Sequence, residues 1–254
     1  MERLLEVQQV CMYFGGVHAV ESMELSLEKG EILGIIGPNG SGKSTLINII
    51  TGVYRPTSGR VSCKGVDITG EKPHKIAAMG VARTFQNLRV FKAMSILENI
   101  VTGEHIKIKA GLAAALFRTP KFRNEEMMAR KRAEELLEFV GLLQMRDEFA
   151  GNVSYGQQKR LEIARALASE PELCLFDEPA AGMNSAEAIH MMNLIRTVRD
   201  EHGIGIILIE HNMEAMMSTA ERIVVIDSGS KIAEDVPAVI QNDPKVIQVY
   251  LGEE

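Results

Sequence analysis

The chain has 254 residues, a net charge of −6 at pH 7 and 24% charged residues. This length suits one large α/β domain, or a core with a small subdomain, and either can bury a substantial apolar interior. The acidic balance argues against a general nucleic-acid binder, which normally carries a basic field. The 3 cysteines are widely spaced and odd in number, so we expect neither a disulfide framework nor a zinc site, and a reducing cytosol as the compartment.

Apolar runs such as residues 110–117 are far shorter than the roughly 18 residues needed to cross a bilayer. The N-terminus, Met-Glu-Arg-Leu-Leu-Glu, lacks the basic-then-apolar pattern of a signal peptide. We therefore expect no membrane span and no export, so that any membrane role depends on a partner.

The first third of the chain is rich in predicted strands. Apolar residues alternate or run together between turn residues, and one predicted helix, at 43–51, interrupts them. The predicted strands are 5–12, 19–27, 31–36, 59–63 and 80–85.

A glycine-rich loop connects the predicted strand at 31–36 to the helix at 43–51. Its sequence, Gly-Pro-Asn-Gly-Ser-Gly-Lys-Ser-Thr, satisfies the pattern G-x-x-x-x-G-K-[ST]. Glycines let backbone N–H groups converge on phosphate oxygens, and the helix N-terminus adds its positive dipole end. The lysine can reach the β- and γ-phosphates, and the hydroxyl after it can bind Mg²⁺. The predicted nucleotide-binding residues here are Gly37, Pro38, Asn39, Gly40, Ser41, Gly42, Lys43, Ser44 and Thr45.

Residues 95–152 are predicted to be helical, because apolar residues recur at helix-like spacing among charges. From residue 156 onward, helices and strands alternate, which implies a parallel sheet with covered faces. The predicted helices are 157–168, 186–200, 213–219, 238–241 and 246–251, and the predicted strands are 173–176, 205–209 and 223–226.

The stretch 107–123 carries Lys107, Lys109, Arg118, Lys121 and Arg123 with no acid among them. A solvated insertion is the simplest interpretation. The alternative is contact with an anionic membrane surface or partner, where each basic residue gains roughly 1 kcal/mol.

Two acids end the apolar strand that begins at residue 173. A P-loop nucleotidase needs a metal-organising carboxylate there and a base one residue later. Asp177 can therefore face Mg²⁺, while Glu178 holds the attacking water. His211 follows the strand at 205–209, at the sheet edge where ligands bind, and is a candidate donor to the γ-phosphate.

The sequence Ser-Tyr-Gly-Gln-Gln-Lys-Arg at 154–160 is a glycine turn that opens an amphipathic helix. From spacing alone, the simpler interpretation is a helix cap with Ser154 as the N-cap residue. The helix N-terminus can also bind a second anion.

Together these motifs resemble the ATP-binding cassette of ABC transporters, in the family's order and over nearly the whole chain. The resemblance implies an α/β fold: a P-loop NTPase core with an antiparallel β subdomain and an inserted α-helical subdomain. It implies one cassette over 1–254, with the nucleotide-binding core and β subdomain at 1–86 and 157–254, and the helical subdomain with the signature loop at 87–156.

The resemblance also implies residue roles. It makes Glu178 the catalytic glutamate, with Lys43 and His211 stabilising charge on the transferred phosphoryl group. Gln86, after Arg-Thr-Phe, is similar to the Q-loop glutamine, so the implied Mg²⁺ positions are Ser44, Gln86 and Asp177.

The segment Ser154, Tyr155, Gly156 and Gln157 resembles the signature sequence that closes over ATP. It departs from the family's Leu-Ser-Gly-Gly-Gln at Val153 and Tyr155. Asn184 stands in the D-loop where aspartate is usual, so the resemblance assigns it no firm role.

An aromatic side chain near the N-terminus stacks on adenine in the family. Phe14 and Tyr13 are the candidates, and Phe14 is favoured. Because adjacent strand residues face opposite ways, we expect only one of them to stack.

Within the family, the chain is similar to the larger ATPase subunit of high-affinity branched-chain amino-acid importers. The resemblance implies ATP and Mg²⁺, transmembrane permease subunits, a second ATP-binding subunit and, indirectly, an amino-acid binding protein, with no nucleic-acid partner. It implies a cytoplasmic location, peripheral on the inner face of the cell membrane. The open alternatives are an importer ATPase for urea or short amides, a soluble non-transport cassette, and a binding module with incidental hydrolysis.

Overall fold

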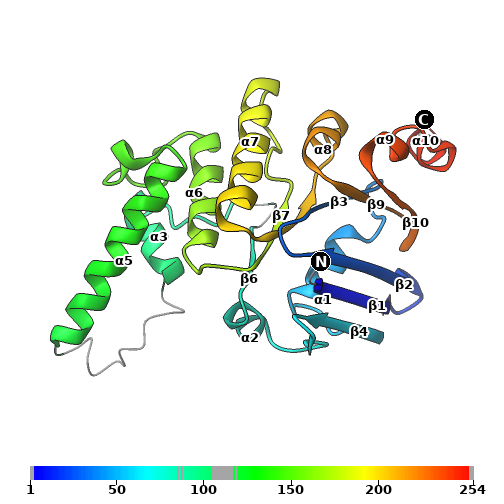
Figure 1. Ribbon diagram of the computed structural model, residues 1–254, viewed down its shortest axis with the longest axis horizontal. Helices are drawn as coiled ribbons and strands as arrows, with labels where there is room; N and C mark the ends of the chain where they lie inside the picture. The colour runs from blue at the N-terminus through cyan, green and yellow to red at the C-terminus, as the bar shows by residue number, and fades with distance from the viewer. Residues whose placement is uncertain (1–2, 85, 87, 105–116, 118, 252–254) are drawn as a thin grey trace. The chain divides into compact units, whose positions relative to one another are not determined.

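The computed structural model describes residues 3–84, 86, 88–104, 117 and 119–251, which form two compact units (Figure 1). The core unit comprises Met1–Arg83 and Glu172–Glu254, and the helical unit comprises Thr84–Pro171. The domain boundaries implied by the resemblance, at 86 and 156, stay a prediction, because compactness by itself does not define a working domain.

A six-stranded sheet in the order β10-β9-β3-β8-β7-β6 forms the centre of the core unit. Five strands are linked by parallel pairing, and β10 pairs antiparallel with β9 at the edge. Every residue of β3, β7 and β8 is buried, as expected of strands covered on both faces. The strands are β3 (Ile32–Ile36), β6 (Val81–Arg83), β7 (Leu173–Asp177), β8 (Gly205–Ile209), β9 (Arg222–Asp227) and β10 (Ser230–Asp235).

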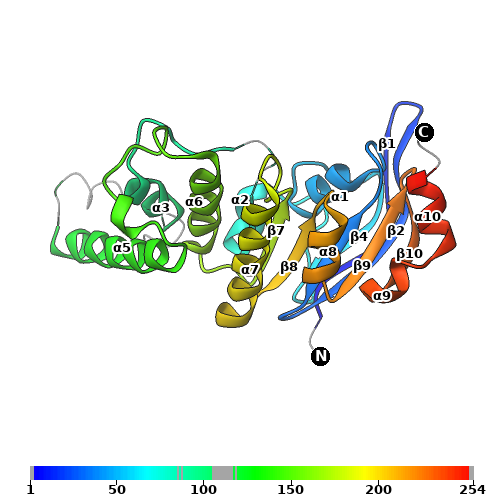
Figure 2. The same cartoon turned by 90° about the horizontal axis from the view of Figure 1, so that it is seen from above.

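Helices and a second sheet cover the two faces. Leu33 and Ile35 of β3 lie in one buried cluster with apolar side chains of α1 and the second sheet. Successive strand residues face opposite ways, so Gly34 lies on the other face, where a Cβ would meet Met216 Sδ of α8 at 2.4 Å. Figure 2 shows α7 and α8 running along the parallel sheet. The helices of the core unit are α1 (Lys43–Ile50), α2 (Pro73–Ala78), α7 (Ser185–His202), α8 (Met213–Thr219), α9 (Pro237–Ile240) and α10 (Pro244–Leu251).

The second sheet is antiparallel, in the order β2-β1-β4-β5. Its strands are β1 (Arg3–Phe14), β2 (Val17–Glu28), β4 (Ser58–Cys63) and β5 (Val66–Asp67). The predicted antiparallel β subdomain is therefore confirmed. The predictions missed β5, α2 and β10. Charged side chains obscure the alternation in β10, whose position comes from its pairing with β9.

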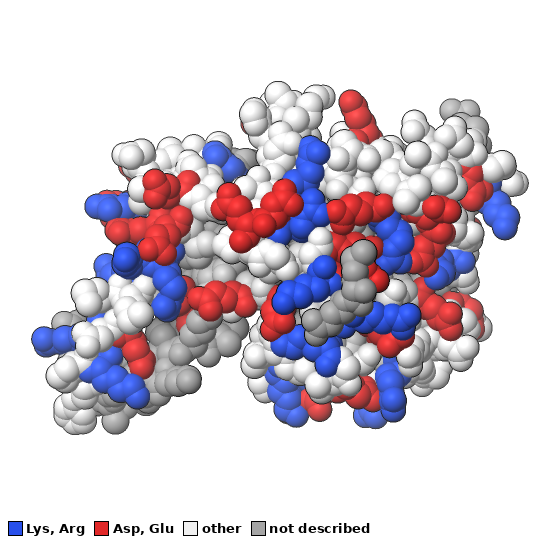
Figure 3. Space-filling model, in the orientation of Figure 1, with Lys and Arg blue, Asp and Glu red and all other residues white. Residues whose placement is uncertain are grey.

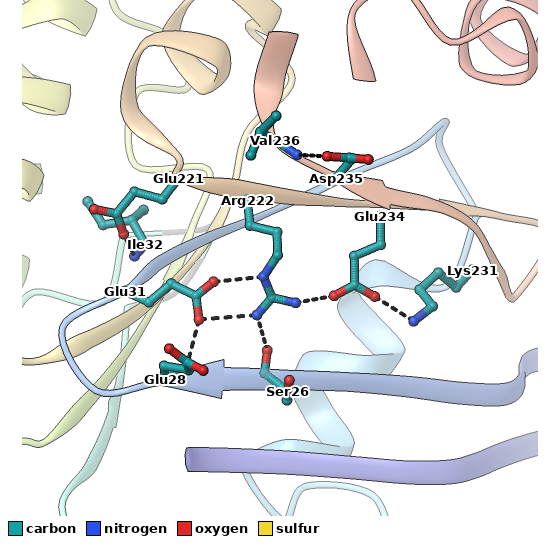
Figure 4. A network of polar contacts seen from close by, with 10 residues as sticks. All are labelled: Ser26, Glu28, Glu31, Ile32, Glu221, Arg222, Lys231, Glu234, Asp235 and Val236. Carbon is teal, nitrogen blue, oxygen red and sulfur yellow. Dashed lines mark hydrogen bonds and ion pairs between the residues drawn. The ribbon is translucent and has the colours of Figure 1, made fainter. Parts of the chain in front are cut away.

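Arg222 joins the two sheets of the core unit (Figure 4). Its guanidinium donates to both carboxylate oxygens of Glu31, at 2.8 and 3.1 Å, and to the Ser26 carbonyl at 2.6 Å. It also pairs with Glu234 of β10, which Lys231 contacts as well. One planar cation thus links the end of β2, the turn before β3 and the edge strand, as the fork of N–H donors on arginine allows.

The helical unit contains α3 (Ile96–Glu104), α5 (Pro120–Phe139), a 3-10 turn (Leu143–Met145) and α6 (Tyr155–Leu167). The buried Glu104 carboxylate accepts from Arg132 Nε at 3.0 and 3.1 Å and from Nη2 at 2.6 Å, which ties α3 to α5. A Cβ at Gly103 would lie 2.4 Å from the Arg165 carbonyl, so α3 also packs closely on α6. The prediction of a helical middle segment is confirmed at Ile96–Glu104 and Pro120–Phe139, whereas residues 146–152 form turns.

Lys107, Lys109 and Arg118 of the basic stretch lie outside the described residues, whereas Lys121 and Arg123 lie at the start of α5. On the face in Figure 3, acidic and basic side chains are interspersed. None of the helices within the described ranges combines the length and apolarity that a bilayer crossing requires.

Candidate functional site

The glycine-rich loop connects β3 to α1, as the sequence predicts. Lys43 Nζ donates to the carbonyls of Gly37 and Pro38, each at 2.7 Å, and lies 3.4 Å from Ser41 Oγ. Lys43 is buried. The ammonium is therefore held among the carbonyls of its own loop.

Neighbouring backbone approaches this loop so closely that two positions require glycine. At Gly37, with φ +152°, a Cβ would lie 2.0 Å from the Ile226 carbonyl of β9. At Gly42, with φ +105°, a Cβ would lie 2.3 Å from the Ala19 carbonyl of β2. The shape of the loop is thus fixed by β2 and β9 as well as by its own sequence.

The N-terminus of α1 is suited to an anion. Its first turn has no acidic residue and no side-chain cap, so its free N–H groups and dipole remain available. Ser44 is exposed in this turn and Thr45 half-buried, while Asn39 and Gly40 are exposed in the loop. These features fit the phosphates of a nucleotide.

Phe14 and Tyr13 differ in how they are held. The Tyr13 hydroxyl donates to Glu21 Oε1 at 3.0 Å, and its ring lies 4.3 Å from that of His18. Phe14 is 44% exposed at the end of β1 and meets Tyr54 edge-on, with 5.4 Å between ring centroids. The arrangement favours Phe14 for stacking, and this role stays a prediction.

Strand register brings the predicted acids and histidine to the same sheet edge as the loop. Asp177 of β7 pairs with Ile209 of β8, which pairs with Ile35 of β3. Adjacent strands lie roughly 4.8 Å apart, so the residues that follow these three strand ends gather there.

Glu178 and His211 face each other at this edge. Glu178 Oε1 lies 2.8 Å from His211 Nε2. Their side chains are 14% and 47% exposed, so the pair is open to solvent on the histidine side. Glu178 has a φ of +51°, in the left-handed region, and its N–H donates to the Ile209 carbonyl at 3.0 Å. The structure therefore brings together the two residues that the sequence assigned to water and γ-phosphate.

Arg83 is a site residue that the sequence analysis missed. Its Nη2 donates to Asp177 Oδ2 at 3.0 Å, and its Nη1 donates to Asn48 Oδ1 of α1 at 2.6 Å. Asp177 is buried. No local signal identifies Arg83, because its partners lie on α1 and β7.

Glu210 was also missed. It lies between β8 and His211, is only 5% exposed, and accepts from Ala180 N at 2.7 Å. Burial raises the pKa of its carboxyl, while the backbone N–H groups of Ala180 and His211 act in the opposite direction. In the sequence it is simply a polar residue beside the histidine.

The residues present fit Mg²⁺ bound with a nucleotide. Within the described residues, no three His, Cys, Asp or Glu side chains cluster closely enough to hold a metal by themselves. Mg²⁺ commonly takes one or two protein oxygens and completes its shell with phosphates and water. Asp177 and the exposed Ser44 hydroxyl are such oxygens in the core unit.

The remaining predicted site residues belong to the helical unit. Gln86 is exposed, and its carbonyl accepts from Lys159 Nζ at 3.2 Å. Ser154 is the N-cap of α6 in a capping box with Gln157, so the helix-cap interpretation is confirmed. Tyr155 is exposed, and Gly156 is half-buried in the same first turn. The signature segment thus presents a capped helix N-terminus.

Comparison with known protein families matches residues 20–181 to the family described as ABC transporter. The chain belongs to this family. Residues 230–254 of the cassette also match the family described as branched-chain amino acid ATP-binding cassette transporter.

The cassette is similar to several known proteins over almost its full length. It is 44% identical over 250 residues to the high-affinity branched-chain amino acid transport ATP-binding protein BraF of Pseudomonas aeruginosa, covering 98% of each chain. A solved ATP-binding cassette of an ABC transporter in its ADP conformation is 35% identical, with a TM-score of 0.87 and full coverage of both chains. A dimeric cassette bound to ADP and Pi is 26% identical, with a TM-score of 0.77, covering 92% of this cassette and 99% of that chain.

Proposed function

We propose that this chain is the ATP-hydrolysing subunit of an importer for branched-chain amino acids. The observation that supports hydrolysis is the gathering of the phosphate loop, Asp177, Glu178 and His211 at one edge of a buried parallel sheet. The substrate class is supported by the likeness to BraF and by the match at residues 230–254.

The phosphates of ATP bind the loop and the N-terminus of α1 in this proposal. Lys43 exchanges the carbonyls of Gly37 and Pro38 for the β- and γ-phosphates. Glu178 holds and polarises the attacking water, and His211 donates to the γ-phosphate, where negative charge must be stabilised. Ser44 and Asp177 would hold Mg²⁺, which would supply a further positive charge to the phosphates.

The remaining predicted roles fall on residues of the helical unit. We propose that Gln86 links the metal and water to the permease, and that Ser154, Tyr155, Gly156 and Gln157 close over the ATP of a second cassette. The dimeric form of a similar cassette bound to ADP and Pi supports the pairing with a second cassette. Closure adds contacts to the γ-phosphate, so ATP favours the closed dimer and hydrolysis releases it.

In this proposal the cassette works at the inner face of the cell membrane, bound to transmembrane permease subunits. The isolated chain then hydrolyses ATP slowly and is stimulated by its permease. Vigorous turnover that no membrane partner increases would instead favour a soluble, non-transport cassette. Stimulation in the presence of urea or short amides, but not branched-chain amino acids, would favour the related importers.

Two variants test the assigned chemistry. We expect Glu178→Gln to bind ATP, dimerise with its partner cassette and hydrolyse at least about 10²-fold more slowly, because it loses the base but keeps the phosphate loop. Lys43→Ala is expected to lose ATP affinity as well. The measurements are binding of a fluorescent ATP analogue and phosphate release. Near-normal turnover by Glu178→Gln would contradict the assigned role.

A further inference from the structure

The ends of β7 and β8 hold each other through reciprocal contacts. Glu178 N, after β7, donates to the Ile209 carbonyl of β8 at 3.0 Å. Glu210, after β8, accepts from Ala180 N, after β7, at 2.7 Å. A third contact, between Glu178 Oε1 and His211 Nε2, lies at the solvent side of this pair of turns. The catalytic side chains thus project from two turns that are fastened to each other.

The turn after β7 needs such support. Glu178 is a non-glycine residue with φ +51°, a conformation that costs roughly 1–2 kcal/mol. The local contact within the turn is the bond from Ala181 N to the Glu178 carbonyl, at 3.2 Å. Strained backbone persists where the surroundings over-determine it. Glu210, directly after β8, supplies this constraint through its carboxylate.

Glu210 itself is placed to hold backbone rather than to touch substrate. It is buried, and its Oε1 accepts from Ala180 N at 2.7 Å. A buried carboxylate without partners would be costly, so the bond from the Ala180 N–H group stabilises it in this position. Ala180 leads out of the Glu178 turn, and His211 carries the second catalytic side chain.

We propose that Glu210 is a positioning residue for ATP hydrolysis: its carboxylate fastens the backbone of the Glu178 turn to the end of β8, directly before His211, and keeps the two side chains aligned. The inference rests on the ATPase activity proposed above. It adds Glu210 to the residues that hydrolysis requires, although Glu210 belongs neither to the phosphate loop nor to the two catalytic side chains.

Glu210→Gln tests this inference, because the amide turns one acceptor oxygen into a donor of similar size. Misplacement by about 1 Å can cost about 10²-fold in rate, so we expect the single-turnover rate of the full chain to fall about 10- to 100-fold with ATP affinity unchanged within about 2-fold. The double variant Glu210→Gln/His211→Ala should lose less activity than the product of the two single effects, because part of the effect of Glu210 passes through His211.

Glu221→Gln is the control for the loss of a carboxylate that accepts a backbone N–H group, although Glu221 is more exposed than Glu210 and also pairs with Arg199. Glu221 Oε2 likewise accepts a backbone N–H, from Ile32 at 2.9 Å, but at the opposite end of β3. The single-turnover rate of Glu221→Gln should stay within about 2-fold of wild type. The small effect of this substitution should add to that of His211→Ala. The thermal unfolding temperature of every variant is measured as well. A variant that unfolds like the wild type but hydrolyses ATP more slowly has misaligned catalytic side chains and has not lost its fold.

A normal rate in Glu210→Gln, or full additivity with His211→Ala, overturns the inference. If Glu210→Gln does not fold, Glu210→Asp takes its place, and its shorter carboxylate must lower the rate at least about 3-fold with ATP affinity retained. A wild-type chain that binds but never hydrolyses ATP contradicts the proposed function instead. If the wild type hydrolyses ATP, His211→Ala is slow and Glu210→Gln has a normal rate, only the role of Glu210 is contradicted.

Discussion

The two halves of the nucleotide site are built differently. The phosphate half is a run of consecutive residues, 37–45, whose lysine bonds to carbonyls of the same loop. The acid half joins Glu178 to Glu210 and His211, which lie about thirty positions further along the chain and meet through the pairing of β7 with β8. A contiguous motif identifies the first half, whereas strand register creates the second.

Removal of the Arg83 side chain, which links the two halves, should have the largest effect on stability. Arg83 contacts Asn48 of α1 and the buried Asp177 of β7. Arg83→Ala leaves that carboxylate without its cation, so we expect the free energy of unfolding to fall by about 3–5 kcal/mol in urea titrations.

The control for this prediction is Arg60→Ala. Arg60 and its partner Asp67 are largely exposed, with side-chain exposures of 65% and 48%, and such pairs contribute about 1 kcal/mol or less. If both variants lose about the same stability, the Arg83 contact does not hold the two halves together.

A pair of glycine substitutions tests how far neighbouring strands shape the phosphate half. Gly37→Ala places a Cβ 2.0 Å from the Ile226 carbonyl, so we expect about 2–3 kcal/mol of destabilisation, together with weaker ATP binding. At Gly40, with φ +78°, no heavy atom lies within 4 Å of an added Cβ. Gly40→Ala should therefore cost about 1–2 kcal/mol, for its backbone conformation alone. Equal losses in chemical denaturation would mean that the approach of β9 is unimportant.

The smallest effect is expected at Asn184, beyond the acid half. Its side chain accepts from Glu187 N at 3.0 Å, in a capping box that begins α7. Asn184→Ala should cost about 1 kcal/mol in thermal unfolding, and Asn184→Asp, which keeps an acceptor, should be close to neutral. A large loss of ATPase rate in Asn184→Asp would show that this residue acts in the chemistry and not only as a cap.

Secondary structure was predicted best where periodicity is strong and least well at edges. The fully buried strands β3, β7 and β8 were found from their apolar runs. The edge strand β10 was missed because its charges serve ion pairs such as that between Lys231 and Glu234. Its position is set by antiparallel pairing with β9, and the local sequence pattern carries no information about that pairing.

The sequence by itself determined the position of the phosphate loop, the order of its partner motifs and the family of the chain, because those signals are contiguous residues with fixed spacing. It also predicted the Ser154 cap, which depends on a bond three residues along the chain. Tertiary structure alone decided that Arg83 holds Asp177 and that Glu210 holds Ala180. These contacts join residues 94 and 30 positions apart, and only the register of neighbouring strands brings such residues within hydrogen-bonding distance.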